Sequence, residues 1–274
     1  MRVVAVIQAR TGSTRLPGKV LLPAKGRPLL EMMLERVAAA RSVDEVVVAT
    51  TRAATDDSIR SLCGRLEVRC VSGDPDDLIK RHLQAARATA ADAVIKIPSD
   101  CPLIDPAVID AVVGFYRTAY PRYTYVSNLH PPSWPDGNDV EVMRVDVLEE
   151  ADREATRPFQ REHTTPFIWD QPNRYSLANV VRADGRDLSA RYRLTLDYPE
   201  DYQLIAAVFG ALHRTDRPPF SGADIIDYLD AHPEIAELNA SHNGYSWTDA
   251  HRDELRTLHH LPGRDSFGIP DGGL

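Results

Sequence analysis

The sequence has few cysteines and no long hydrophobic run. Cys63, Cys70 and Cys101 are the three cysteines among its 274 residues, and none belongs to a C-x-x-C pair. An odd number at these spacings predicts neither a disulfide framework nor a zinc site, so we expect buried, reduced thiols. No apolar stretch approaches the roughly 18 residues that span a bilayer, and the first residues resemble a strand rather than a signal peptide. The sequence therefore predicts a cytoplasmic protein without a membrane segment.

An excess of positive charge is also missing. Lys and Arg together number 32 and Asp and Glu 40, which gives a formal net charge of −8. A field of this sign repels phosphate backbones, so we expect no nucleic-acid partner. Cations cluster locally between residues 10 and 27, where they suit a small anion instead.

Two common phosphate-binding motifs are absent. The stretch from Gly12 to Lys19 resembles a P-loop, but five residues rather than four separate its glycines. Val20 stands where a P-loop has its Mg²⁺-binding Ser or Thr, and Pro17 removes a backbone donor. No G-x-G-x-x-G is present either, so we do not expect a dinucleotide-binding protein.

The first twenty residues carry the clearest signal in the chain. Val3 to Ile7 is an apolar, β-branched run that predicts a strand buried on both faces. From Gln8 to Lys19 the chain changes to glycines, hydroxyls and cations, which can bind a polyphosphate. A basic turn exposed to solvent would have the same composition, so composition alone does not distinguish it from a phosphate-binding loop. The position directly after a buried strand favours a ligand site, because open sheets bind ligands at the carboxyl ends of their strands.

The remaining pattern predicts an α/β fold with three layers around a mostly parallel, mixed sheet. Strands expected at 45–50, 68–71 and 93–97 alternate with helices beginning near 28, 56, 76 and 106. The alternation stops after Tyr116, and we interpret residues 125–185 as an inserted arm. Inside it we expect strands at 123–127, 139–143 and 175–181 and helices at 145–155 and 162–169.

After the arm the α/β pattern resumes. We expect a strand at 191–195 and helices at 197–212 and 222–231. The prediction is a single domain over residues 1–245 with a polar tail, 246–274. In the tail we expect a helix at 249–261 and a disordered, glycine-rich end.

Two aspartates follow predicted strands directly. Asp100 comes after the strand at 93–97, and Asp197 follows the one at 191–195. Carboxylates at the ends of neighbouring strands can converge on one Mg²⁺. Taken alone, an aspartate after a strand is more often a helix cap or a turn residue than a metal ligand. We accept the capping role for Asp105, before Pro106, and expect Asp201 to be a solvated residue in the first turn of a helix.

Five stretches of the chain form distinct motifs: Ala9-Arg-Thr-Gly-Ser-Thr-Arg-Leu-Pro-Gly-Lys19, Ser99-Asp-Cys-Pro-Leu-Ile-Asp105, Pro135-Asp-Gly-Asn-Asp-Val-Glu-Val142, Arg161-Glu-His-Thr-Thr-Pro166 and Thr195-Leu-Asp-Tyr-Pro-Glu-Asp201. They resemble motifs of the cytidylyltransferases that activate acidic sugars to CMP-3-deoxy-manno-octulosonate or CMP-sialic acid, and in particular of the branch called spore-coat polysaccharide biosynthesis protein F. The likeness covers residues 1–245. Ser99 replaces the glycine that is usual in the family.

The resemblance implies a fold of the nucleotide-diphospho-sugar transferase type and a set of residue roles. The first loop would hold the triphosphate of CTP, and Asp100 and Asp197 would hold the catalytic Mg²⁺ or Mn²⁺. Catalysis would depend on these aspartates with Arg10 and Lys19. The residues implied for the nucleotide are Ala9, Arg10, Gly12, Ser13, Arg15, Lys19, Asp77 and Arg81. An i,i+4 ion pair explains Asp77 and Arg81 equally well.

The resemblance also implies an acceptor pocket in the arm. Arg161 and His163 would bind the carboxylate of an acidic sugar, and Asp136, Asp139 and Glu141 its hydroxyls. Alternatively, Asp136-Gly137 makes a hairpin turn and Glu162 begins a helix. For His163 we favour an orienting hydrogen-bond donor over a proton carrier.

The predicted reaction transfers CMP from CTP to a hydroxyl of an acidic or related sugar and releases pyrophosphate, for a surface polysaccharide or specialised glycoconjugate. The resemblance further implies a homodimer formed through the arm. The alternative within the same fold is a glycosyltransferase that uses a nucleotide-sugar donor. We rank it lower because Asp100-Cys-Pro lacks the second aspartate of a D-x-D motif. A non-catalytic nucleotide sensor is disfavoured because Asp100 and Asp197 are both present.

Overall fold

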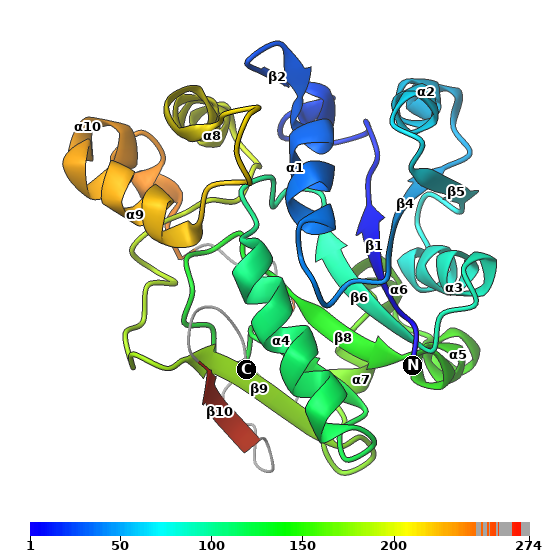
Figure 1. Ribbon diagram of the computed structural model, residues 1–274. Helices are drawn as coiled ribbons and strands as arrows, with labels where there is room; N and C mark the ends of the chain where they lie inside the picture. Colours follow the sequence, from blue (N-terminus) through cyan, green and yellow to red (C-terminus); the bar gives the residue numbers. More distant parts are fainter. Residues whose placement is uncertain (245–247, 249–250, 252, 256, 258–264, 270–274) are drawn as a thin grey trace.

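The protein is described by a computed structural model that covers residues 1–244, 248, 251, 253–255, 257 and 265–269 (Figure 1). Strand β1 (Val3–Gln8) lies inside the sheet, paired in parallel with β4 (Glu45–Thr51) and β6 (Ala93–Pro98). Its first five residues are fully buried, as expected for a strand covered on both faces. On the far side of β4 lies the parallel strand β5 (Arg69–Gly73).

The sheet has eight strands in the order β10-β9-β7-β8-β6-β1-β4-β5. Strand β8 (Glu141–Arg144) is antiparallel to both β6 and β7 (Tyr125–Ser127). Strand β9 (Leu177–Arg182) is parallel to β7, and β10 (Asp265–Ile269) is parallel to β9. The predicted mixed, mostly parallel sheet is therefore confirmed. A separate two-stranded hairpin joins β2 (Pro23–Ala24) to β3 (Arg27–Pro28).

Helices cover both faces of the sheet, which confirms the three layers (Figure 1). Successive residues of a strand point to opposite faces. Val3, Ala5 and Ile7 pack in one cluster with residues of α1 (Leu29–Ala38), α2 (Asp57–Arg65) and α4 (Pro106–Ala119). Val4 and Val6 pack in another with residues of α3 (Leu78–Ala88) and α5 (Val145–Glu154).

A third cluster lies under α8 (Pro199–Leu212) and α9 (Gly222–Ala231), which pack beside α1. The one-turn helix α10 (Pro233–Ala236) follows, and short 3-10 turns occur at Lys19–Leu21, Ala54–Asp56 and Ala240–His242. No helix among the described residues is both long and apolar enough to cross a bilayer. All three cysteines are free thiols; Cys63 and Cys101 are buried and Cys70 is half-buried.

The segment predicted as an arm is integrated into the domain. Its strands β7, β8 and β9 extend the main sheet, and its helices pack on one face. The single helix expected at 162–169 is instead two, α6 (Pro158–His163) and α7 (Pro166–Trp169). Thr164 between them has a φ of 70°, and Pro166 lacks the N–H that a continuous helix would need.

The strand expected at 191–195 is not part of the sheet. This segment contacts residue Asp136 through a single parallel bridge at Arg193. The pairing does not extend further because Gly137, with a φ of 95°, turns the neighbouring chain away.

The tail contains a strand that the sequence did not predict. Residues 265–269 form β10 along the edge of β9, where we expected a disordered end. The ring centroid of Phe267 lies 4.5 Å from that of Phe115 and 6.2 Å from that of Tyr123. The strand thus covers an edge and an aromatic surface that would otherwise be open. The helix expected at 249–261 lies largely outside the described residues.

We expect Phe267→Ala to lower the free energy of unfolding by about 1–3 kcal/mol, because it removes a half-buried ring from this aromatic contact. Urea unfolding measures the change. Phe267→Leu is the matched control and should keep most of the stability. If the alanine variant unfolds like the parent, β10 does not contribute to the fold.

Candidate active site

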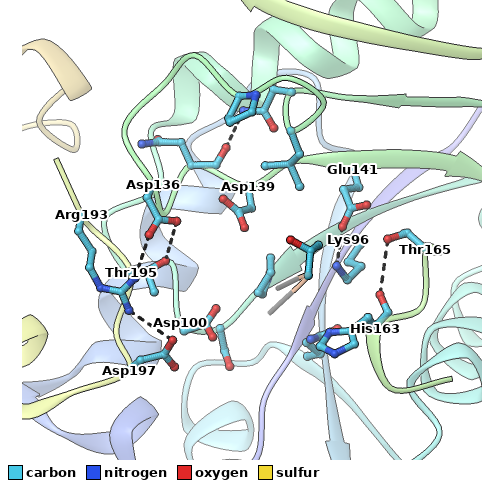
Figure 2. Close-up of a pocket in the computed structure, with 18 of the residues that line it drawn as sticks. Lys96, Asp100, Asp136, Asp139, Glu141, His163, Thr165, Arg193, Thr195 and Asp197 are labelled. Atoms are coloured by element: carbon cyan, nitrogen blue, oxygen red, sulfur yellow. Dashed lines mark hydrogen bonds and ion pairs between the residues drawn. The ribbon is translucent and has the colours of Figure 1, made fainter. Parts of the chain in front are cut away.

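A cavity of about 1050 Å³ opens at the carboxyl ends of β1 and β6. It is lined on one side by the loop after β1 and on the other by the loop between β7 and β8, with residues from 193 to 197 closing a third side. Figure 2 shows the carboxylates that project into it from different segments. The position of the cavity agrees with the rule that open α/β sheets bind ligands at the carboxyl ends of their strands.

The loop after β1 lies along the cavity as the sequence predicted. Ala9, Arg10, Gly12, Ser13, Arg15 and Lys19 all line it. Asp56 holds the loop, since its carboxylate accepts hydrogen bonds from the Thr11 amide (2.8 Å), the Thr11 hydroxyl (2.7 Å) and the Thr51 hydroxyl (2.5 Å). Burial alone would raise the pKa of Asp56, but these hydrogen bonds lower it. From the sequence, we expected Asp56 only to begin a helix.

Lys19 joins the two aspartates predicted to bind metal. Its Nζ lies 3.1 Å from Asp100 Oδ2, 2.9 Å from Asp197 Oδ1 and 2.8 Å from the Leu196 carbonyl oxygen. Arg15 is 2.7 Å from the same oxygen of Asp197. Burial alone would lower the pKa of Lys19, but Asp100 and Asp197 raise it, so the side chain stays an ammonium. The structure thus brings together four of the predicted site residues.

Asp201 positions Asp197 and is not the solvated residue that the sequence suggested. Its side chain is 0% exposed and accepts hydrogen bonds from the backbone amides of Asp197 (2.8 Å) and Tyr198 (2.9 Å). Arg193 and Asn239 also donate to it, at 2.9 and 2.8 Å. Asp201 is buried because it joins the turn before α8 both to Arg193 in the preceding segment and to Asn239 well after the helix, and no local pattern reveals these contacts.

Asp136 and Asp139 face Asp100 across the cavity (Figure 2). Asp136 is 3.1 Å from Arg193, and the Thr195 hydroxyl donates to it at 3.4 Å. Burial and the neighbouring Asp100 raise the pKa of Asp136 to about 6, although Arg193 opposes the shift. Burial, Asp136 and Asp100 raise the pKa of Asp139 to about 8.

Glu141 lines the cavity but is already paired. Its carboxylate lies 2.5 Å from Lys96 Nζ and accepts a 2.6 Å hydrogen bond from the Tyr125 hydroxyl. Burial would raise the pKa of Glu141, whereas Lys96 and these hydrogen bonds lower it. We did not predict Lys96 as a site residue, although a lysine inside the apolar strand run at 93–97 is itself a signal of function.

His163 and Arg161 occupy different positions, although both were predicted to bind the carboxylate of the acceptor. His163 lines the cavity, and burial and Lys96 lower its pKa to about 3, so its ring is neutral. Arg161 is absent from the described cavity lining, because its guanidinium is 2.7 Å from Asp77 and 2.6 Å from Asp152. The acceptor-binding role expected for Arg161 therefore finds no support in its position.

The alternative ion pair between Asp77 and Arg81 is also not formed. Asp77 caps α3, accepting a 3.0 Å hydrogen bond from the Lys80 amide, and pairs with Arg161 outside the cavity. Arg81 lines the cavity, is 2% exposed, and donates only long hydrogen bonds to the carbonyl oxygens of Ala49 (3.3 Å) and Pro75 (3.4 Å).

The donor set around Lys19 is compatible with a small, hard cation. Asp100 and Asp197 already face one positive charge, and the cavity leaves space for water and phosphate oxygens, the other ligands that Mg²⁺ prefers. No three His, Cys, Asp or Glu side chains are grouped for a metal ion anywhere in the described part of the chain. A divalent ion here would therefore depend on ligands supplied by a bound substrate.

The family model described as cytidylyltransferase matches residues 4–220. This span contains every cavity residue discussed so far. The chain belongs to the cytidylyltransferase family.

Individual relatives agree with this assignment. The spore coat polysaccharide biosynthesis protein SpsF of Bacillus subtilis (strain 168) is 30% identical over 85% of this cytidylyltransferase and 96% of its own length. The structure of a cytidylyltransferase from Leptospira borgpetersenii serovar Hardjo-bovis (strain JB197) is similar with a TM-score of 0.81 and 32% identity, covering 86% of this chain and 97% of that chain. The 3-deoxy-manno-octulosonate cytidylyltransferase of Geobacter sulfurreducens (strain ATCC 51573 / DSM 12127 / PCA) is 38% identical over 42% of this chain and 45% of its own. The family resemblance inferred from the motifs is thus confirmed.

We expect Asp201→Asn to lower the free energy of unfolding of the cytidylyltransferase by about 3 kcal/mol, because it leaves Arg193 less well paired in a buried site and turns an amide donor toward other donors. Urea unfolding checks the value. Glu200→Gln, one residue away and 46% exposed, is the control and should change stability by less than about 0.5 kcal/mol. Equal stability of the two variants would contradict the positioning role.

Proposed function

We propose that this cytidylyltransferase transfers CMP from CTP to the hydroxyl of a sugar and releases pyrophosphate. The observation that carries the proposal is the contact of Lys19 with Asp100 and Asp197, beside a cationic glycine loop. The acceptor hydroxyl oxygen forms a bond to the α-phosphorus, and the bond from that phosphorus to the oxygen bridging the β-phosphate breaks. Asp136, whose pKa is raised to about 6, is suited to accept the hydroxyl proton.

The loop after β1 supplies the charge that a triphosphate needs. Arg10, Arg15 and Lys19 line one side of the cavity, and each contacts another part of the protein there: the Pro75 carbonyl oxygen, Asp197, and the Leu196 carbonyl oxygen, respectively. Cations fixed in advance stabilise the negative charge that develops on the departing pyrophosphate without a further cost of reorganisation.

We assign Arg81, which lines the same cavity, to recognition of the pyrimidine ring of CTP. Its guanidinium is buried in the cavity wall and burial lowers its pKa, to about 10, so the group remains charged. Its long hydrogen bonds to two carbonyl oxygens leave it able to donate to a better acceptor. The ring oxygen O2 and nitrogen N3 of cytosine are such acceptors.

Asp100 and Asp197 would hold Mg²⁺ or Mn²⁺, which would neutralise phosphate charge and lower the pKa of the acceptor hydroxyl when bound. The two aspartates are kept in place by Lys19 on one side and by the backbone hydrogen bonds of Asp201 on the other. The acceptor side chains are those in the other half of the cavity: Asp136, Asp139, Glu141 and His163. By likeness to the relatives, we assign the product to a surface polysaccharide or glycoconjugate.

We expect pyrophosphate release when the protein is given Mg²⁺, CTP and the right sugar, with CTP preferred over the other three nucleoside triphosphates. Asp100→Asn and Lys19→Ala should each reduce turnover on the order of 100-fold, since they remove charge at the reacting phosphates. A coupled phosphate assay measures release. Asp57→Asn, at a 70% exposed carboxylate outside the cavity, is the control. Near-full turnover of either site variant would contradict the mechanism, and consumption of a CMP- or UDP-sugar without release from CTP would favour a glycosyltransferase.

We also propose a homodimer formed through the segment 125–185, as the family resemblance implies. Light scattering at micromolar concentration should then give about twice the chain mass of 30.5 kDa. A mass equal to that of one chain would contradict the dimer while leaving the proposed chemistry untouched.

A further inference from the structure

Thr164 lies between two residues that line the cavity. Helix α6 ends at His163 and Thr165 precedes α7, and both of these residues line the cavity. Thr164 itself is 0% exposed and is not part of the described lining. Figure 2 shows His163 and Thr165 on the side of the cavity where Lys96 and Glu141 lie. The three consecutive residues therefore alternate between the cavity and the protein interior.

The backbone at Thr164 is strained. Its φ of 70° and ψ of −55° are close to those of the classic γ-turn, which is rare in proteins. The hydrogen bond that defines this turn is present, since the Thr165 amide donates to the His163 carbonyl oxygen at 2.8 Å. Positive φ is unfavourable for a β-branched residue, because the two substituents on its Cβ crowd the backbone. Glycine would adopt this conformation at a lower cost, yet a threonine occupies the position.

The side chain of Thr164 adds a second cost. Its hydroxyl is buried and has no hydrogen-bond partner among the described residues. A buried hydroxyl without a partner is unfavourable, and a valine would fill nearly the same volume without it. The structure around the turn therefore maintains it against two local penalties. Penalties of this kind persist at positions where the resulting geometry serves a functional site.

The helices on both sides of the turn are fixed in place. The Thr164 amide donates to the Gln160 carbonyl oxygen at 3.0 Å, which joins the turn to α6. Arg161 anchors α6 through ion pairs with Asp77 at 2.7 Å and Asp152 at 2.6 Å. Every residue of α7 is buried. Because neither helix is free to move, the conformation at Thr164 sets the direction of the two side chains beside it.

Those two side chains can donate hydrogen bonds without carrying a charge. Burial and Lys96 lower the pKa of His163 to about 3, so its ring is neutral. Thr165 contributes a hydroxyl, and against the effect of burial Lys96 and hydrogen bonds including that of Thr165 lower the pKa of Glu141. A neutral imidazole and a hydroxyl suit the hydroxyl and carboxylate oxygens of an acidic sugar. Their use depends on position, since a displacement of about 1 Å already weakens binding and transfer.

We infer that Thr164 is a positioning residue for the acceptor: its buried side chain holds the γ-turn that directs His163 and Thr165 into the cavity. The inference rests on the proposed function, because it concerns the acceptor of the same cavity. The shape of the Thr164 side chain matters and its hydroxyl does not, so valine should replace it. Glycine should not, because it relieves the strain but removes the buried anchor and frees the backbone to take other conformations.

The first test compares Thr164→Gly with Thr164→Val. Pyrophosphate release is measured with Mg²⁺, CTP and the sugar acid 3-deoxy-manno-octulosonate as probe. For Thr164→Gly we expect the KM for the sugar to rise about 10-fold, whereas the KM for CTP stays that of the parent. Thr164→Val should keep both values. Ala90→Gly, at an exposed residue with a φ of 50° that does not line the cavity, controls for glycine at a positive φ and should change neither.

The second test does not depend on turnover. Nuclear magnetic resonance of protein with ¹³C-labelled histidine rings reports the surroundings of His163, whose signal is assigned by its absence from His163→Gln. Thr164→Gly should move or split this signal, because the ring is no longer held in one orientation. Thr164→Val and Ala90→Gly should leave it within a line width of its position in the parent.

The two tests separate the inference from the proposed function. If the parent is active, an unchanged sugar KM in Thr164→Gly would overturn the inference. An equal rise in both KM values, or a Thr164→Val variant that behaves like Thr164→Gly, would overturn it too. A parent that releases no pyrophosphate would reject the proposed reaction with this sugar acid, and the His163 signal then decides: an unchanged signal in Thr164→Gly overturns the positioning role, and a signal displaced in Thr164→Gly alone supports it.

Discussion

The ammonium group of Lys19 joins the segments that form the candidate active site. Lys19 Nζ contacts Asp100, Asp197 and the Leu196 carbonyl oxygen, and these belong to segments about 80 and 180 positions away along the chain. In a deep cavity such a contact is favourable only when all partners are held with good geometry. Much of the surrounding structure serves this requirement: the buried strands β1 and β6 place Lys19 and Asp100 at the same edge of the sheet, and Asp201 places Asp197.

Two buried carboxylates hold the backbone segments around the site in place. Asp56 fixes the loop after β1 through three hydrogen bonds, and Asp201 fixes the turn before α8 through backbone amides and Arg193. Neither lines the cavity. Residues of this kind act on chemistry through position alone, since a displaced phosphate or aspartate loses the alignment that transfer requires. The loop and the turn can therefore be rigid although neither belongs to a regular element.

Charge is distributed in the cavity so that each half suits a different ligand. The cations of the loop after β1 are complementary to a polyphosphate, whereas the half lined by residues 128–141 and 162–169 contains carboxylates, and its cations Lys96 and Arg193 are already in ion pairs. Proteins with the same fold and a similar loop after β1 can therefore differ in what they bind, because the charges left unpaired in the second half depend on which ion pairs form there.

The sequence by itself determined the alternating elements, the mixed sheet, the family and the cationic loop after β1. These follow from local hydrophobic periodicity and from contiguous motifs such as residues 9–19. Only the tertiary structure decided which charged side chains are used in ion pairs within the protein and which face the cavity. It buried Asp201, turned Arg161 toward Asp77, paired Lys96 with Glu141, kept residues 191–195 out of the sheet and added β10 at its edge. Each of these depends on partners far apart in the sequence, and the burial that sets their hydrogen bonds and pKa values exists only once the chain has folded.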